Sequence, residues 1–152
     1  MGRSDKYVEG VGVSQAMMPT AEHLPTGQVV QYSTTPPTSG NHWATPARCG
    51  FYSDGLPDEQ VVHNLEHSNI VISYNLAAPE EVEALRKAVD RVGLSRAWGV
   101  TRYYDKVPPG TVALAGWNWE NSLNCVNQAK IADDYPPLPD PCYPARGCST
   151  GS

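Results

Sequence analysis

Proline and glycine interrupt this chain so often that long regular elements can form only in its central part. Its 152 residues include 14 prolines and 13 glycines, which gather at both ends and in a few turns. Proline fixes φ and removes a hydrogen-bond donor, whereas glycine permits tight bends. We therefore expect one domain in which short elements are joined by long loops, with enough residues for a core of its own.

The clearest predicted element is an amphipathic helix at residues 79–92. Pro79 suits the first turn of a helix, and Gly93 suits the position just after the last one. Apolar side chains recur on one stripe of this helix, at Val82, Leu85, Val89 and Val92. That stripe predicts packing against a sheet. A shorter helical stretch of one or two turns is expected at residues 58–68.

Several short strands complete the predicted domain. Residues 27–33 and 69–74 are predicted to be strands, and residues 97–105 and 111–119 are predicted to pair as a hairpin through Pro109 and Gly110. The predicted fold class is therefore α+β, with a small, mostly antiparallel sheet, one main amphipathic helix and long loops.

Both ends of the chain differ from this central domain, which we place at residues 21–132. Residues 1–20 form an extended arm, in which the glycine-rich stretch at 7–13 is either a strand or a flexible leader. Residues 133–152 form a Pro/Cys-rich tail that cannot build a core. Because an arm can add a strand to the sheet of a neighbour, we predict a homopolymer, a filament or tube, assembled through arm and tail.

Charge and cysteine content restrict the class of protein. The net charge is -5 and the 11 basic residues are scattered, which argues against nucleic acid as a partner. No apolar run is long enough to span a membrane. The cysteines are Cys49, Cys125, Cys142 and Cys148, an even number without a CxxC pair. This pattern favours disulfides, preferably Cys142–Cys148 and Cys49–Cys125, over four reduced thiols, and it predicts an extracellular or cell-surface location.

Histidine is the residue type that points most directly to a function. The chain has four histidines. His63 and His67 are four residues apart, so a helical turn places both imidazoles on one face. His42 follows a stiff Pro/Gly loop. Imidazole is a common ligand of copper, zinc, iron and nickel, although two histidines at this spacing are as often ordinary surface or capping residues.

The run from His63 to His67, HNLEH, also matches the HxxEH pattern of inverted zincins. In such enzymes the two histidines bind zinc and the glutamate activates a water molecule. The pattern is short, and a third ligand on a later helix is hard to find here. Glu66 could instead be a solvated carboxylate or a partner that orients a ligating imidazole. A zinc-dependent hydrolase is therefore the alternative hypothesis.

Longer motifs resemble a known family. The runs PPTSGNH (residues 36–42), CGFY (49–52) and VHNLEHSNIVISY (62–74), with EHLPTGQVVQY (22–32) and GTVALAGWNW (110–119), are similar to the DUF3105 family of uncharacterised domains. The resemblance covers roughly residues 20–120. It implies an exported or membrane-tethered domain that binds metal, with all four histidines at motif positions. The chain departs from the family in carrying Ser68 where glycine is preferred, in lacking the usual N-terminal anchor and in adding a Cys/Pro-rich tail.

The combined prediction is a non-catalytic extracellular or cell-surface domain with a transition-metal site. The predicted ligands are His23, His42, His63 and His67, with Met17 or Met18 as a softer candidate. Copper is the first choice of metal and zinc the second.

Overall fold

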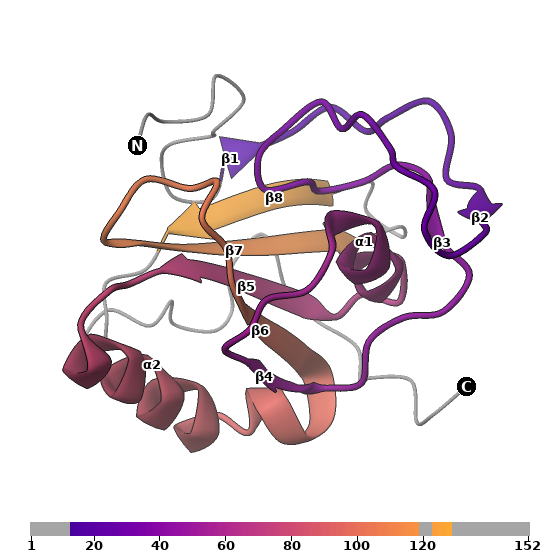
Figure 1. Ribbon diagram of the computed structural model, residues 1–152. Helices are drawn as coiled ribbons and strands as arrows, with labels where there is room; N and C mark the ends of the chain where they lie inside the picture. The colour runs from indigo at the N-terminus through magenta and orange to yellow at the C-terminus, as the bar shows by residue number, and fades with distance from the viewer. Residues whose placement is uncertain (1–12, 119–122, 129–152) are drawn as a thin grey trace.

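A six-stranded sheet occupies the centre of the molecule in the computed structural model, which describes residues 13–118 and 123–128 (Figure 1). The strands are β1 (Val13–Ser14), β2 (His23–Leu24), β3 (His42–Trp43), β4 (Gly50–Tyr52), β5 (Ile70–Asn75), β6 (Gly99–Tyr103), β7 (Thr111–Asn118) and β8 (Leu123–Gln128). The helices are α1 (Asp58–Glu66), α2 (Pro79–Arg91) and the π-helix η1 (Leu94–Trp98). Strands β2 and β3 form a separate two-stranded pair.

The order of the strands in the main sheet is β1-β8-β7-β5-β6-β4. Three of the pairings, β1–β8, β8–β7 and β7–β5, are antiparallel, and β5–β6 and β6–β4 are parallel. The predicted α+β fold class with a mostly antiparallel sheet is therefore confirmed.

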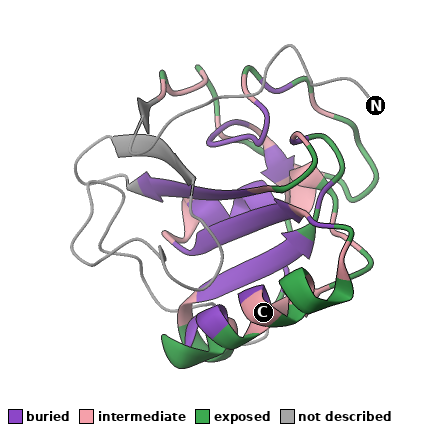
Figure 2. Ribbon diagram, turned by 90° about the vertical axis from the view of Figure 1, so that its left-hand side faces the viewer, coloured by how far each residue is buried: buried purple, intermediate pink, exposed green. Residues whose placement is uncertain are grey.

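The two α-helices cover opposite faces of the sheet because the side chains of β5 alternate between two cores. Ile70, Ile72 and Tyr74 belong to the cluster that contains Leu85 and Val89 of α2. Val71 belongs instead to the cluster that contains residues Val61, Val62 and Leu65 of α1, together with Trp117 of β7. Figure 2 shows the resulting layers, with buried strands and with α2, at the bottom, exposing its outer side. Burying each large apolar side chain in this way contributes about 1.5–3 kcal/mol.

The predicted helices and the strand between them are confirmed, with ends that differ by one or two residues. Helix α2 begins at Pro79 and is followed by Gly93 in the left-handed region, at φ 68°. Helix α1 ends at Glu66, and Ser68 just beyond it also has a positive φ, 64°. This conformation is unfavourable for a residue with a Cβ, which gives a physical reason for the family's preference for glycine at this position.

The predicted hairpin is wrong. Strands β6 and β7 both exist, but β5 lies between them and pairs with both. The apolar strand β5 is buried on both faces and takes the central position, while α2 provides the crossover that a parallel β5–β6 pair requires.

The predicted strand at residues 27–33 is also wrong, since this segment is irregular. Its backbone is held by side chains instead. The Val30 amide donates to Glu59, and the Gln28 carbonyl accepts a hydrogen bond from the Trp43 indole. Val29 is 75% exposed, so its apolar side chain does not mark a buried strand here.

Most of the predicted arm and all of the predicted tail lie outside the described residues. Within the described part, Val13 and Ser14 form β1 and pair with Val126 and Cys125 of β8. Cys49 is disulfide-bonded. The side chains of the other cysteines are outside the described part, so the predicted pairing stays a prediction. No helix in the described residues is long and apolar enough to cross a membrane.

Candidate metal centre

Strands β2 and β3 bring two histidines that are distant in sequence to neighbouring positions. The strands are parallel, and His23 is directly opposite His42. The pairing is closed by hydrogen bonds from the His42 amide to the Glu22 carbonyl (3.0 Å) and from the Ala44 amide to the Leu24 carbonyl (3.1 Å). Because paired residues of adjacent strands project to the same face, both imidazoles point the same way.

The loop before His42 is held in place by its small and polar residues. Gly40 has φ 122°, and a Cβ at this position would lie 2.8 Å from the Met18 sulfur, so no other residue fits without a shift. The Asn41 side chain accepts hydrogen bonds from the Thr20 hydroxyl and the Glu22 amide, both at 2.8 Å. The PPTSGNH run therefore serves to fix the position of His42.

Helix α1 supplies the other donors. His63 and Glu66 are one helical turn apart and share a face, and His67 is the C-cap residue that follows the helix. The buried Asn64 fastens the helix to the chain that follows β3, since its amide group exchanges two hydrogen bonds with the backbone of Ala47, at 2.9 and 2.8 Å. These two hydrogen bonds hold α1 in a fixed position beside the β2–β3 pair.

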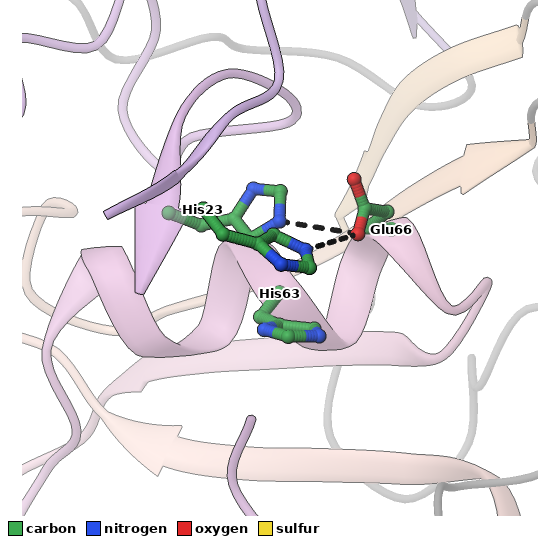
Figure 3. A group of neighbouring side chains, drawn as sticks. His23, His63 and Glu66 are labelled. Carbon is green, nitrogen blue, oxygen red and sulfur yellow. Dashed lines mark hydrogen bonds and ion pairs between the residues drawn. The ribbon is translucent and has the colours of Figure 1, made fainter. Parts of the chain in front are cut away.

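Four side chains from these segments converge on one point. His23, His42, His63 and Glu66 each present one donor atom, and these atoms all lie within 4.8 Å of one another. The three imidazole rings are almost equally spaced, with centroids 4.8–4.9 Å apart. Tetrahedral ligands at about 2.0–2.1 Å from a zinc ion lie about 3.3 Å from each other, so a small contraction would close the site around an ion. Figure 3 shows His23 and Glu66 pointing toward one another, with His63 beside them.

Backbone carbonyls fix the tautomers of the two buried histidines. The Nδ1 atom of His42 is 2.8 Å from the Gly40 oxygen, and the Nδ1 atom of His63 is 2.7 Å from the Trp43 oxygen. A carbonyl oxygen can only accept, so each Nδ1 carries the hydrogen. When these rings are neutral, each Nε2 therefore presents a lone pair to the centre. This is the usual arrangement of metal-binding histidines, in which the second nitrogen donates to a carbonyl or carboxylate.

When His42 is neutral, one contact in the centre joins two hydrogen-bond acceptors. The Nε2 atom of His42 is 3.2 Å from Oε1 of Glu66, and the His42 side chain is completely buried. This Nε2 has no hydrogen-bond partner. The same Oε1 already accepts a hydrogen bond from Nε2 of His23 at 3.1 Å. A buried lone pair facing a carboxylate is costly unless a cation lies between them.

His67 contacts this group from one side. Its Nε2 is 3.1 Å from Nε2 of His63. Because His63 has its hydrogen on Nδ1, His67 must be the donor in this hydrogen bond. Burial lowers the pKa of His63 below its ordinary value, and the nearby histidines act in the same direction. His63 is thus kept neutral, the state in which imidazole binds a metal.

Three of the four predicted ligands, His23, His42 and His63, are therefore brought together, and Glu66 rather than His67 is the fourth member of the group. Met17 and Met18 pack against the apolar cluster around Trp117. The sequence motif predicts Glu66 only as a base, a solvated group or an orienting partner. Its place one turn after His63 is the signal that could have identified it as a donor.

Comparison with known proteins places the chain in a family without assigning it a reaction. No curated protein and no solved structure was found to match it. The family model that does match is described as a protein of unknown function, and it covers residues 23–135, well over half of the sequence. The chain therefore belongs to the DUF3105 family, as its motifs predict.

Proposed function

We propose that this domain is a metal-binding module that holds one transition-metal ion between His23, His42, His63 and Glu66. The observation that carries the proposal is the buried contact between Nε2 of His42 and Oε1 of Glu66, at 3.2 Å. With a neutral His42 this contact joins two acceptors, and an ion between the two atoms would replace it by two coordinate bonds. It would also satisfy the otherwise unpartnered Nε2.

Copper is the first choice for this ion and zinc the second. Three imidazoles and one carboxylate suit both metals, and the affinity of a nitrogen and oxygen site for divalent ions is highest for copper. An exposed His23, with 53% of its side chain accessible, leaves the centre open on one side for an ion to enter.

A structural or binding role is better supported than hydrolysis. In an HxxEH hydrolase the glutamate must be free to activate water while both histidines of the motif bind zinc. Here Oε1 of Glu66 contacts His42 and His23, and His67 is not a member of the convergent group. We therefore assign Glu66 the role of a ligand.

Metal analysis of purified protein tests this function. We expect about one equivalent of copper or zinc in wild-type protein, measured by inductively coupled plasma mass spectrometry and by calorimetric titration of chelator-treated protein. His42→Gln and His63→Gln should each weaken binding at least a hundredfold. His67→Gln, which alters a hydrogen bond to Nε2 of His63 but removes no member of the convergent group, should change the affinity much less.

The Glu66→Gln variant tests whether the Glu66 carboxylate is a metal ligand. We expect a large loss of metal affinity in this variant and none in the control Glu81→Gln, whose residue is exposed on α2. Folded wild-type protein that stays metal-free in metal-replete buffer would overturn the proposal. Hydrolase activity that disappears in Glu66→Gln while the metal stays bound would favour the enzyme instead.

We further propose that the domain is an extracellular or cell-surface subunit that assembles with copies of itself. The support is the glycine-rich N-terminal stretch in the sequence, a segment of the kind that adds a strand to the sheet of a neighbour. Deletion of residues 1–12 leaves the described domain complete. Filaments of intact protein that are lost on this deletion, seen by electron microscopy, would support the proposal, and a monomeric intact protein would contradict it.

A further inference from the structure

A cavity lies at the other end of helix α1 from the histidines. Its volume is about 720 Å³, and its walls come from residues 29–35, from residues 54–59 and from residues 103–106. Residues Asp58 and Glu59 of these walls form the first turn of α1, whereas Glu66 ends the helix at the metal centre. The cavity is therefore separate from the candidate metal centre.

The walls combine negative charge with exposed apolar surface. Four carboxylates line the cavity, and the lining contains one cation, Lys106. The carboxylates are those of Asp54, Asp58, Glu59 and Asp105. Val29 and Tyr103, also in the lining, are 75% and 37% exposed, which is unusual for large apolar side chains. Such a surface is complementary to a cationic group that is attached to an apolar one.

One wall already binds two cations of the protein itself. The guanidinium of the buried Arg102 stacks on the Tyr104 ring at 3.8 Å and pairs with Asp58 at 2.8 Å. From the cavity side, the Lys106 ammonium is 3.6 Å from Asp58 and 5.9 Å from the same ring. Carboxylate and aromatic ring together thus form a surface that holds both kinds of basic side chain.

Lys106 is held loosely enough to be displaced. Its side chain is 61% exposed, and an exposed ion pair of this length contributes only about 0–1 kcal/mol. Among the described residues, no ion pair joins the exposed Asp54 or Asp105 to a cation, so both add negative potential at the rim. An incoming cation could therefore take the place of Lys106 at Asp58.

We propose that this cavity binds a basic side chain, arginine or lysine, from a peptide segment of another protein. The cation occupies the place of the Lys106 ammonium, and flanking apolar residues of the peptide cover Val29 and Tyr103. A metal ion is a poor alternative occupant. In the described part of the chain, the single group of donors close enough to hold an ion is the one around His42.

Fluorescence anisotropy with a labelled peptide tests the proposal. The probe is an acetylated and amidated Gly-Val-Arg-Val-Gly peptide, and its control has glutamine in place of arginine. We expect the arginine peptide to bind full-length protein at least tenfold more tightly than the glutamine peptide at low salt. The double change Asp54→Asn with Asp105→Asn should weaken binding at least fivefold, whereas Asp90→Asn on α2 should not change it.

Lys106→Ala gives the discriminating result, because removal of the internal competitor should tighten peptide binding several-fold. Lys87→Ala, at an exposed position of α2, removes the same charge far from the cavity and should change affinity much less. The proposal is overturned if the two peptides bind equally or not at all, if Lys106→Ala and Lys87→Ala act alike, or if the Asp54 and Asp105 changes have no effect. Metal binding at the histidines should be the same in all of these variants.

Discussion

At its N-terminal end helix α1 meets a buried cation, and at its C-terminal end it meets buried histidines that face a carboxylate. The Arg102 side chain is fully buried, yet it pairs with Asp58 and donates to the Ser73 hydroxyl and the Leu56 carbonyl. Of its donors, Nη2 alone lacks a hydrogen bond. At the other end, His42 is just as deeply buried, but its Nε2 has no hydrogen-bond partner and lies 3.2 Å from Oε1 of Glu66.

This difference separates a structural charge network from a binding site. Around Arg102 positive and negative groups are both supplied by the chain, so the network is complete when the chain folds. Around His42 the chain supplies donors of electron pairs and leaves the cation to be added. A buried group of electron-pair donors without a cation from the chain is therefore a better indicator of a metal than a buried network in which both charges are present.

The largest expected effect on the free energy of unfolding is at the charge network around Arg102. Arg102→Met removes the cation while Asp58 stays only 13% exposed, so we expect a loss of about 3–5 kcal/mol in the free energy of unfolding. Urea denaturation measures this loss. Lys106→Met, which removes the exposed partner of the same carboxylate, should cost less than about 1 kcal/mol. Equal costs for the two changes would show that burial does not set the strength of this network.

Metal binding at the histidines near the C-terminal end of α1 should stabilise the protein. At a free copper or zinc concentration about a hundred times the dissociation constant, we expect the free energy of unfolding to rise by about 2.7 kcal/mol. A thermal melt with and without metal measures this gain as a higher Tm. His42→Gln should melt at the same temperature with and without metal. A metal-dependent rise that persists in His42→Gln would place the ion elsewhere.

Glu66→Gln should affect the metal-free protein in the opposite direction to its effect on metal binding. A glutamine amide can donate to Nε2 of His42, which replaces a repulsive contact by a hydrogen bond worth about 1 kcal/mol. We therefore expect chelator-treated Glu66→Gln to be more stable than wild type in urea, and Glu81→Gln to be unchanged within about 0.5 kcal/mol. A less stable metal-free Glu66→Gln would mean that the carboxylate is already satisfied without an ion.

The smallest expected effect is at Ser68, just beyond the C-terminal end of α1. Its φ of 64° costs a side-chain-bearing residue about 1–2 kcal/mol. Glycine removes that cost but loses more entropy on folding, so Ser68→Gly should gain about 0.5 kcal/mol, measured by urea denaturation. Ser53→Gly, at an exposed position without positive φ, should give no gain. Metal affinity should not change in either variant, which would show that strain at this end of the helix is independent of the site.

Local sequence patterns were enough to predict α1, α2 and β5, because Pro79, Gly93 and the spacing of apolar residues act within one element. The position of β5 between β6 and β7 depends on packing against both α1 and α2, which no local pattern contains. Strand β4 is too short, and the LNCVNQ sequence of β8 too polar, to give a strand signal. Val29 and Val30 favoured a strand in the sequence, but their segment is irregular and is held by side-chain hydrogen bonds rather than by strand pairing.

The ligand set could be predicted only as far as helical geometry allowed. Glu66 and His67 are three and four residues from His63, and both spacings place a side chain on the same face. Which of them meets His23 and His42 depends on the side of α1 along which β2 and β3 lie. The position of α1 relative to these strands is set by tertiary contacts, such as the two hydrogen bonds between Asn64 and the backbone of Ala47.

The β2–β3 pair also determines how the metal centre would respond to damage of the chain. His23 and His42 are held opposite each other by a pairing of only two residues on each strand, and the loop between them connects the pair covalently. That connection keeps the effective concentration of each imidazole at the centre high. One proteolytic cut in residues 25–41 would leave every donor atom in the sample but would lower this effective concentration. Metal retention would therefore report on the continuity of the backbone as well as on the presence of the ligands.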